Sequence, residues 1–439
     1  MNASIIIPVW NGHEFLPTCL DALLGQGYAD MEIIAVDNAS TDDSAHLIAE
    51  NYPQVHLISN DRNAGFAGGC NLGIAASQGD IVVLLNQDTR VLPGWLSALL
   101  DGFRDAPAVG VAGCKILYPD GTTLQHAGGW IEWPLGQAHH FGSMERDVGQ
   151  WDTSRDVGYV TGASLAFRRR VIADIGLLDE GFWPGYFEDA DFCFRARSAG
   201  YRVRYIPQAV LLHAETTSVT DPLLLSRFYQ RGRLRFVVKH LPPQRVVTEF
   251  VPAEAESQLA AMRGRESAAL RLAYLETIPS LPGLLRQCWT ASDTIVANTI
   301  TAFQALYASA WRTAWQIEEE RIATEAHGPE SSNEPEPLAL PPLHEPQFTL
   351  GLRPSGRWVD RFARLFYERI TAQALRDVVR QQEAINSQLR GAHDRQVILG
   401  RQRETAFRAH MEAVARQMAV LAEENAVLAK SIAQQNMLK

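Results

Sequence analysis

The first hundred residues alternate short apolar strands with helices, and this alternation constrains the fold more than any other feature. Buried strands are predicted at residues 4–8, 31–36, 55–59 and 81–85. Helical apolar spacing covers residues 15–24 and 43–50, and a further helix follows the loop 63–69. Strands that alternate with helices indicate a mostly parallel sheet covered on both faces. The sequence therefore predicts an α/β domain at the start of the chain.

Polar residues follow three of these strands. Asn11 comes after the first strand, Asp37 and Asn38 end the second, and Asn86 and Asp88 end the fourth. In such sheets, ligands bind outside the carboxyl ends of the strands. We therefore expect one nucleotide-type site at this edge of the sheet.

A later run, YFEDADFCFR, places Glu188, Asp189 and Asp191 among aromatic residues. Burying an unpaired carboxylate is costly, because desolvation disfavours its charged form. The run therefore predicts a pocket in which the acids meet a metal, another cation or a proton-donating substrate. Together with the strand ends, it indicates an enzyme that handles a metal-bound phosphate ligand and takes a proton from an acceptor.

Composition excludes several other classes of protein. The 439 residues predict two or three domains, and a net charge of −10 argues against a nucleic-acid-binding surface. The five scattered cysteines form no CxxC pair, which argues against a disulfide framework and favours a reducing compartment. Neither a signal peptide nor a transmembrane run of ~18–20 apolar residues is predicted.

The helix predicted over 223–240 carries a basic stripe. Its four members lie at successive i+4 steps: Arg227, Arg231, Arg235 and Lys239. One interpretation is attraction to an anionic membrane surface or a lipid diphosphate. The alternative is a helix face packed on the preceding domain.

The second half of the chain has a different character. Residues 241–325 read as a helical extension, 326–352 as a linker rich in proline and glutamate, and 353–439 as a long helix. Heptad positions between Met411 and Ile432, with Asn425 in the seam, predict a coiled coil that forms a homodimer through residues 404–436. The alternative is a helix that folds back onto residues 253–325.

Seven motifs along residues 3–240 resemble the family-2 nucleotide-sugar glycosyltransferases, most closely their rhamnosyltransferase-like branch. In order they are SIIIPVWN, AVDNASTDDS, NAGFAGGCN, LLNQDT, VTGASLAFRR, FEDADFCFRARSAGYR and LLHAETTS. The resemblance implies a GT-A fold with a Rossmann-like mixed sheet. Its nucleotide-binding half would be residues 1–100 and its acceptor half residues 101–240. It also implies inverting transfer that uses a divalent cation.

The resemblance assigns the nucleotide-sugar site. Asp37 matches the acid that binds the nucleobase, although an acid here also starts turns and caps helices. The loop over the nucleotide-sugar would include Asn63, Gly65, Gly68 and Gly69, because glycine lets the backbone approach a ligand closely. The remaining donor-binding residues would be Pro8, Asn11, Asn38 and Asn86.

The metal and catalytic residues are assigned in the same way. Asp88 would bind Mg²⁺ or Mn²⁺ in the family's Asp-x-Asp motif, where Asn86 replaces the first acid, and His213 would complete that site. Asp189 matches the catalytic base and Glu188 a group that binds acceptor hydroxyls. Asp191 is expected to hold the loop or to pair with Arg195.

The function implied is transfer of a sugar from a dTDP- or UDP-sugar to a glycan or lipid-linked acceptor in cell-surface polysaccharide synthesis. That work is expected in the cytoplasm, at the inner face of the membrane. One alternative is a nucleotide-sugar-binding scaffold that has lost catalysis, although Asp88, Asp189 and His213 argue against it. Another is a coiled-coil assembly protein that carries the nucleotide-sugar-binding domain, which is compatible with enzyme activity. A sugar nucleotidyltransferase would need a glycine-rich phosphate loop, which PVWNGHEF lacks.

Overall fold

A computed structural model describes residues 1–215, 221–261 and 266–326. The chain divides into two units, Met1–Ala310 and Trp311–Lys439, and the site lies in the first. The predicted linker and terminal coiled coil, from residue 327 onward, lie outside the described residues. The proposed dimer through 404–436 and the fold-back alternative therefore stay predictions, as do the domain boundaries.

Four parallel strands form the first half of the sheet, as the sequence predicts. They are β1 (Ala3–Val9), β2 (Met31–Asp37), β3 (His56–Ser59) and β4 (Ile81–Leu85). The strand β1 pairs with both β2 and β4, and β2 pairs with β3. Their carboxyl ends therefore meet at one edge, where the predicted donor-binding residues lie.

The second half of the sheet mixes directions. The antiparallel strand β11 (Ser164–Arg168) joins β4 to β6 (Val109–Leu117), and β12 (Arg202–His213) runs parallel to β6. The short strands β5 (Thr89–Val91), β7 (Leu124–His126) and β10 (Arg155–Asp156) pair with β12, β6 and β12. A separate hairpin consists of β8 (Gly129–Glu132) and β9 (Gln137–His140).

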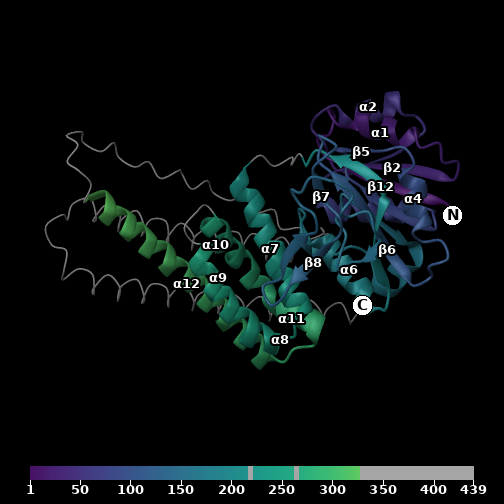
Figure 1. The fold of residues 1–439 in the computed structure, drawn as a ribbon. Coiled ribbons are helices and arrows are strands. Elements are labelled where there is room, and N and C mark those ends of the chain that lie inside the picture. Colours follow the sequence, from purple (N-terminus) through teal and green to yellow (C-terminus); the bar gives the residue numbers. More distant parts are fainter. Residues whose placement is uncertain (216–220, 262–265, 327–439) are drawn as a thin grey trace, which may run out of the picture. The chain divides into compact units, whose positions relative to one another are not determined.

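Helices cover both faces of the sheet (Figure 1). Alternate residues of β1 serve two cores: Ile5 and Ile7 pack with α1 (Leu16–Leu24) and α4 (Trp95–Asp101), whereas Ile6 packs with α3 (Gly65–Ala76). Three more helices belong to this domain: α2 (Ser44–Asn51), α5 (Arg169–Ile175) and α6 (Glu188–Ser198). The predicted α/β mixed sheet followed by a helical region is confirmed.

A helical region follows the sheet. It comprises α7 (Pro222–His240), α8 (Pro243–Arg245), η2 (Val246–Phe250), α9 (Val251–Ala261), α10 (Glu266–Thr277), η3 (Ile278–Ser280), α11 (Leu281–Trp289) and α12 (Asp293–Ala326). The short 3₁₀ turn η3 lies at the proline break that the sequence indicates. Within the described ranges, none of the helices combines the length and apolar character needed to cross a bilayer.

The basic residues of the α7 stripe form ion pairs with acidic residues of the same chain. Arg227 and Arg231 pair with Glu276 of α10. Arg235 and Lys239 each lie 2.8 Å from Asp179. The four side chains are 14–21% exposed and pair with acids on other elements, as the packed alternative expects, whereas the membrane interpretation stays a prediction.

Two strand boundaries differ from the prediction. The sequence predicts Arg202–Tyr205 as one strand and an apolar run before His213 as another, whereas β12 is continuous across both, with a bulge between Ile206 and Val210. The sequence also predicts a strand over 160–167, whereas β11 begins only at Ser164. In the turn before it, the backbone N–H of Gly162 contacts the site, as described below.

Candidate active site

Strand pairing brings Asp88 and His213 together across 125 residues of sequence. The antiparallel register of β5 and β12 sets Thr89 opposite His213, so Asp88 lies beside the imidazole. Asp88 Oδ1 and His213 Nε2 are 3.1 Å apart, and the two side chains are 7% and 10% exposed. A carboxylate oxygen and an imidazole nitrogen thus face one another at the carboxyl edge of the sheet.

Two residues that the sequence analysis missed orient this histidine. Gln125 Nε2 donates to Glu215 Oε2 at 3.1 Å, which turns Gln125 Oε1 toward His213 Nδ1 at 2.7 Å. An amide oxygen only accepts, so Nδ1 carries the proton. In the neutral ring, Nε2 therefore presents a lone pair toward Asp88, which is the tautomer that binds a metal.

The other two residues of the Asn86–Gln87–Asp88 motif contact protein groups. Asn86 Nδ2 lies 3.2 Å from His213 Nε2, and its backbone oxygen accepts from Thr89 Oγ1 at 2.7 Å. Gln87 exchanges two hydrogen bonds with the backbone of Trp10, at 3.0 and 3.1 Å. These bonds fix the end of β4 against the end of β1, so the motif is held rigidly.

The ends of β1 and β2 form the adjacent part of the edge. Asp37 is buried, and its Oδ1 accepts from the Ser40 N–H at 3.2 Å. Asn11 Oδ1 accepts from the Thr41 N–H at 2.7 Å. Pro8 lies in β1 opposite Val36. All of these predicted donor-binding residues therefore lie at the same edge as Asp88.

The amide of Asn38 is fully engaged within the protein. Its Nδ2 donates to Gly65 O at 2.9 Å and to Asn63 Oδ1 at 3.3 Å. Its Oδ1 accepts from Asn60 Nδ2 and from the Ala64 N–H, at 3.1 and 3.0 Å. Two donors and two acceptor positions are all that an amide offers. In this conformation Asn38 shapes the loop after β3 and leaves no hydrogen-bonding position for a ligand.

The predicted glycine loop is shorter than the sequence analysis expects. Gly68 and Gly69 lie inside α3 and are buried, so they are not loop residues. A Cβ at Gly69 would stand 3.2 Å from Asn38 Nδ2 and 3.3 Å from Pro8 Cβ. This glycine therefore permits close packing of the helix on the sheet. Of the four predicted residues, Asn63 lies in the connection and Gly65 is the first residue of the helix.

Gly65 joins this connection to the loop before α6. Its φ is +73°, and a Cβ there would lie 2.7 Å from Trp183 Cδ1. Phe66 N donates to Pro184 O at 2.8 Å, and Trp183 Nε1 donates to Asn63 O at 3.4 Å. Trp183 therefore packs on the predicted donor loop, whereas Phe182 is part of the core.

The loop before α6 holds a strained backbone. Tyr186 and Phe187 have φ of +75° and +74°, a conformation that costs non-glycine residues about 1–3 kcal/mol each. The strain is held by packing, because Gly232 of α7 lies directly against Tyr186 O. The turn sets Glu188 and Asp189 at the first positions of α6.

Asp189 and Glu188 have different surroundings. Asp189 accepts from the Gly162 N–H at 2.8 Å and the Ala190 N–H at 2.7 Å. Glu188 is 6% exposed, and its Oε2 has no hydrogen-bond partner among the described residues. Burial raises the pKa of both groups, and the charge of Asp189 raises that of Glu188 further, well above its usual value. Ionised Asp189 beside protonated Glu188 is the state that these contacts favour.

Asp191 has a structural role, as expected. It is fully buried, and its oxygens accept from Arg195 Nε at 2.8 Å, His240 Nε2 at 2.7 Å and Lys239 Nζ at 2.7 Å. These partners hold its pKa far below the usual range despite burial. The predicted pair with Arg195 is confirmed, and the carboxylate ties α6 to α7.

A histidine pair lies between the two parts of the site. His126 Nδ1 and His140 Nδ1 are 2.9 Å apart. Burial lowers the pKa of both rings, and the charges of Asp189 and Glu215 oppose this shift at His140. His140 therefore lies within electrostatic range of both the acid pair and the Gln125–His213 chain. Sequence reasoning missed this pair because its members come from two strands without a motif spacing.

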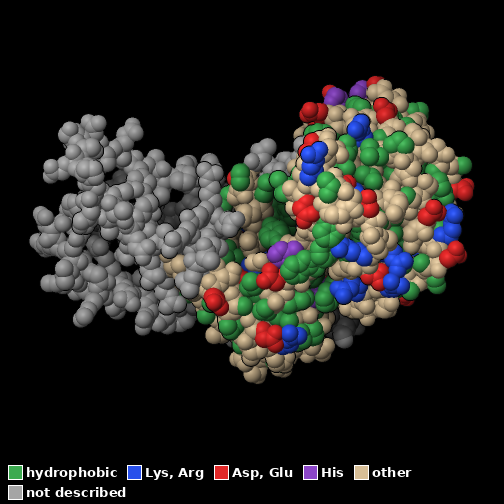
Figure 2. All heavy atoms as spheres, viewed as in Figure 1, with side chains coloured by type: hydrophobic (Ala, Val, Ile, Leu, Met, Phe, Trp, Pro, Cys, Tyr) green, Lys and Arg blue, Asp and Glu red, His purple; other side chains and the backbone are tan. Residues whose placement is uncertain are grey.

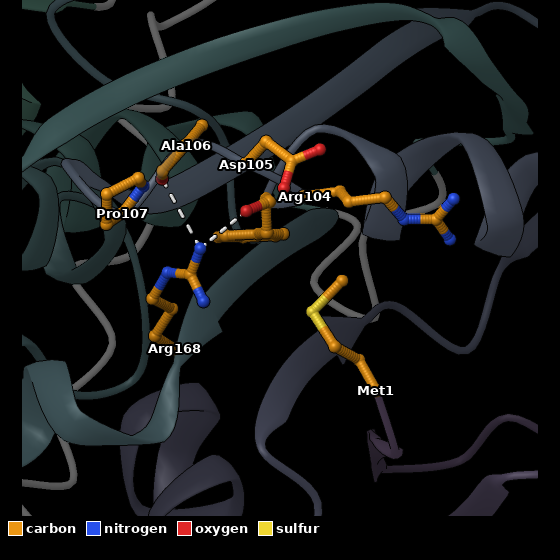
Figure 3. Close-up of a pocket in the computed structure, with 7 residues that line it drawn as sticks. Met1, Arg104, Asp105, Ala106, Pro107 and Arg168 are labelled. Atoms are coloured by element: carbon orange, nitrogen blue, oxygen red, sulfur yellow. Dashed lines mark hydrogen bonds between the residues drawn. The ribbon is translucent and has the colours of Figure 1, made fainter.

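A hollow of about 430 Å³ lies at the other edge of the sheet and takes no part in this site (Figure 3). Arg168 lines this hollow. It pairs with Ile81, the first residue of β4, and so lies at the amino ends of the parallel strands. Its guanidinium donates to the carbonyls of Phe103, Ala106 and Val109, at 2.5, 3.3 and 2.9 Å. These bonds use the guanidinium to hold the loop before β6.

Residues 4–176 match the profile of glycosyl transferase family 2. Together with the fold and the motif order, this match makes residues 4–176 similar to family 2 of the glycosyltransferases. One of the relatives reported next is named a rhamnosyltransferase, in line with the branch that the motifs resemble.

Three curated relatives match mainly this domain. An uncharacterised protein of Sinorhizobium fredii is 31% identical over 232 residues, 49% of this chain and 24% of the relative. The O-antigen biosynthesis protein RfbC of Myxococcus xanthus is 30% identical over 224 residues, 49% of this chain and 17% of the relative. The N-acetylglucosaminyl-diphospho-decaprenol L-rhamnosyltransferase of Mycobacterium tuberculosis is 29% identical over 214 residues, 44% of this chain and 69% of the relative.

The chain thus spans a quarter or less of the length of the first two relatives. Among solved structures, GalNAc-T7 with UDP, GalNAc and Mn²⁺ aligns with a TM-score of 0.46 and 14% identity, over 59% of this chain and 51% of that chain.

Proposed function

We propose that this chain is an inverting, metal-dependent glycosyltransferase. It moves a sugar from a dTDP- or UDP-sugar to a saccharide or lipid-linked saccharide in cell-surface polysaccharide synthesis, at the inner face of the membrane. The observation that carries the proposal is the Asp88–His213 pair at 3.1 Å, whose imidazole is held at Nδ1 by Gln125 Oε1 at 2.7 Å. The names of the Myxococcus and Mycobacterium relatives support the acceptor class.

The donor set fits a divalent cation. Two ligand atoms about 2.1 Å from Mg²⁺, at a right angle, lie about 3.0 Å apart, close to the observed 3.1 Å. No group of three or more His, Cys, Asp or Glu suited to a metal occurs in the described ranges, so phosphate and water oxygens would complete the shell. When bound, the cation neutralises charge on the departing diphosphate.

Three acidic residues of the chain have the remaining roles in this proposal. Asp37 lies where it accepts a hydrogen bond from a nucleobase N–H. Asp189, held ionised by two backbone N–H groups, takes the proton of the acceptor hydroxyl as that oxygen attacks the anomeric carbon. Glu188, protonated, donates a hydrogen bond to a sugar hydroxyl. A single carboxylate base suits one displacement with inversion.

A donor screen tests the proposal. Release of nucleoside diphosphate from a panel of dTDP- and UDP-sugars is measured with Mg²⁺, Mn²⁺ or chelator. We expect release with at least one donor, loss of release with chelator, and weakened donor and metal binding in Asp88→Ala. Release that is indifferent to chelator and to Asp88→Ala would show that the pair holds no metal.

A further inference from the structure

An exposed aromatic surface lies on the hairpin β8–β9, outside the residues assigned above. Trp130 is 40% exposed, and its ring stacks on His139, with centroids 4.3 Å apart and planes 17° from parallel. His139 Nε2 in turn lies 2.7 Å from Glu132 Oε2. We name Trp130, His139 and Glu132 the hairpin platform.

The hairpin platform is held in place before any ligand binds. Trp130 and His139 are direct partners in the β8–β9 register. Tyr159 OH donates to His139 O at 3.2 Å, and Gly129 O accepts from the Gly158 N–H at 2.8 Å. A stacked, tethered ring loses little entropy on binding, so it suits recognition of a ligand.

The hairpin platform lies near the acid pair. Gly158 packs against Trp130 and begins the segment whose Gly162 N–H contacts Asp189. Four residues of extended chain span at most ~14 Å. His140, next to His139 in β9, interacts electrostatically with Asp189. The platform is therefore within reach of a short oligosaccharide whose end lies at Asp189.

The chemistry of the hairpin platform fits a sugar ring. One face of a pyranose presents C–H groups, which pack on an aromatic face, and its hydroxyls need hydrogen-bond partners at the edge. His139 and Glu132 supply such partners, with side chains 38% and 42% exposed. In Figure 2 histidine and hydrophobic side chains gather beside a hollow near the place where Figure 1 labels β8.

We propose that the hairpin platform is an acceptor subsite, which binds a sugar ring of the acceptor saccharide other than the ring that receives the new sugar. The inference rests on the proposed function, of which it specifies the acceptor site. Trp130 stacks on the ring, His139 supports the indole, and Glu132 accepts from a hydroxyl group.

An array of bacterial surface oligosaccharides and polysaccharides, probed with the full chain, tests the subsite. We expect the wild type to bind a set of these glycans, and Trp130→Ala to bind them at least about tenfold more weakly. Trp130→Phe keeps a flat ring and should restore part of the binding. Leu177→Ala, at an exposed apolar residue outside the hairpin, is the matched control and should bind as the wild type does.

Two outcomes would overturn the subsite: no glycan bound by the wild type, or equal binding by Trp130→Ala. Unfolding curves of both Trp130 variants show whether a loss of binding reflects a loss of fold, and a folded Trp130→Phe that binds no better than Trp130→Ala also counts against stacking. The array requires no donor turnover, so its failure is separate from failure of the donor screen.

Discussion

The buried ion pair between Arg233 of α7 and Glu254 of α9 gives a stability prediction with a definite size. Arg233 is 3% exposed and Glu254 2% exposed. The guanidinium donates to both carboxylate oxygens, at 2.9 and 2.6 Å, and Tyr274 OH donates to the same carboxylate at 2.7 Å. The fourth contact, from Arg233 Nη1 to Leu135 O at 2.8 Å, reaches the turn of the β8–β9 hairpin.

Glu254→Ala leaves the guanidinium buried and unpaired, which costs about 3–5 kcal/mol. An unfolding entropy of about 2.1 cal/mol/K per residue, over the unit Met1–Ala310, gives about 0.65 kcal/mol/K. The melting temperature should therefore fall by about 5–8 °C. Circular dichroism melts of the full chain measure the shift.

The double variant Arg233→Met with Glu254→Leu separates pairing from packing. Replacing a buried pair by apolar residues of similar size is neutral or stabilising, so most of the lost stability should return. The double variant, however, lacks the contact from Arg233 to Leu135 O in the hairpin turn, so it should bind glycans more weakly than the wild type. A single variant that melts within 1 °C of the wild type would refute the reasoning, and so would a double variant as unstable as the single.

Three further predictions follow from the site. Gln125→Leu removes the group that fixes the His213 tautomer, so the Mn²⁺ concentration for half-maximal donor turnover should rise about 10–100-fold; an unchanged Mn²⁺ titration would contradict this. Burial raises the pKa of Asp189, so transfer should fall as pH drops through a value above the usual ~3.9; an acid limb at or below that value, in a pH–rate profile, would speak against Asp189 as the base. Glu188 has a pKa that is raised in the folded state, so its contribution to stability is present below its unfolded pKa of ~4.3 and is lost as pH rises. Glu188→Gln should therefore be more stable than the wild type against urea at pH 8 but not at pH 4. A variant as stable as the wild type at both pH values would count against a buried, strained acid.

The sequence predicts the parallel half of the sheet closely, because its strands are continuous buried β-branched runs. The predicted strand 81–85 matches β4, and the predicted helix 15–24 lies within one residue of α1. Strands of the mixed half are harder to predict, because their pairing depends on distant partners and on a bulge. Motif order, rather than periodicity, is what pointed to Asp88 and His213.

The parts of the site that sequence reasoning missed depend on contacts between elements. Gln125 and Glu215 orient His213 through contacts between distant elements, and no spacing links their positions in the sequence. The i+4 steps of the basic residues on α7 are visible in the sequence, whereas Asp179 and Glu276, which form ion pairs with them, come from other elements. Gly69 fits the pattern of a ligand-binding loop in the sequence, because glycine occurs both in such loops and where a helix packs closely on a sheet. The position of Asn38 next to Gly69 in the structure distinguishes the second role from the first.

The helix α7 connects the acid pair to the rest of the site. Gly232 permits the close contact with Tyr186 O that holds the strained turn before Glu188, and Lys239 and His240 bind Asp191 three residues further on. On the same helix, Arg233 holds the turn of the hairpin. Strain of about 1–3 kcal/mol per residue persists only where surrounding contacts exceed it. The helix α7 therefore supports both the turn before Asp189 and the turn of the hairpin, so the helical region after the sheet contributes to the shape of the candidate site.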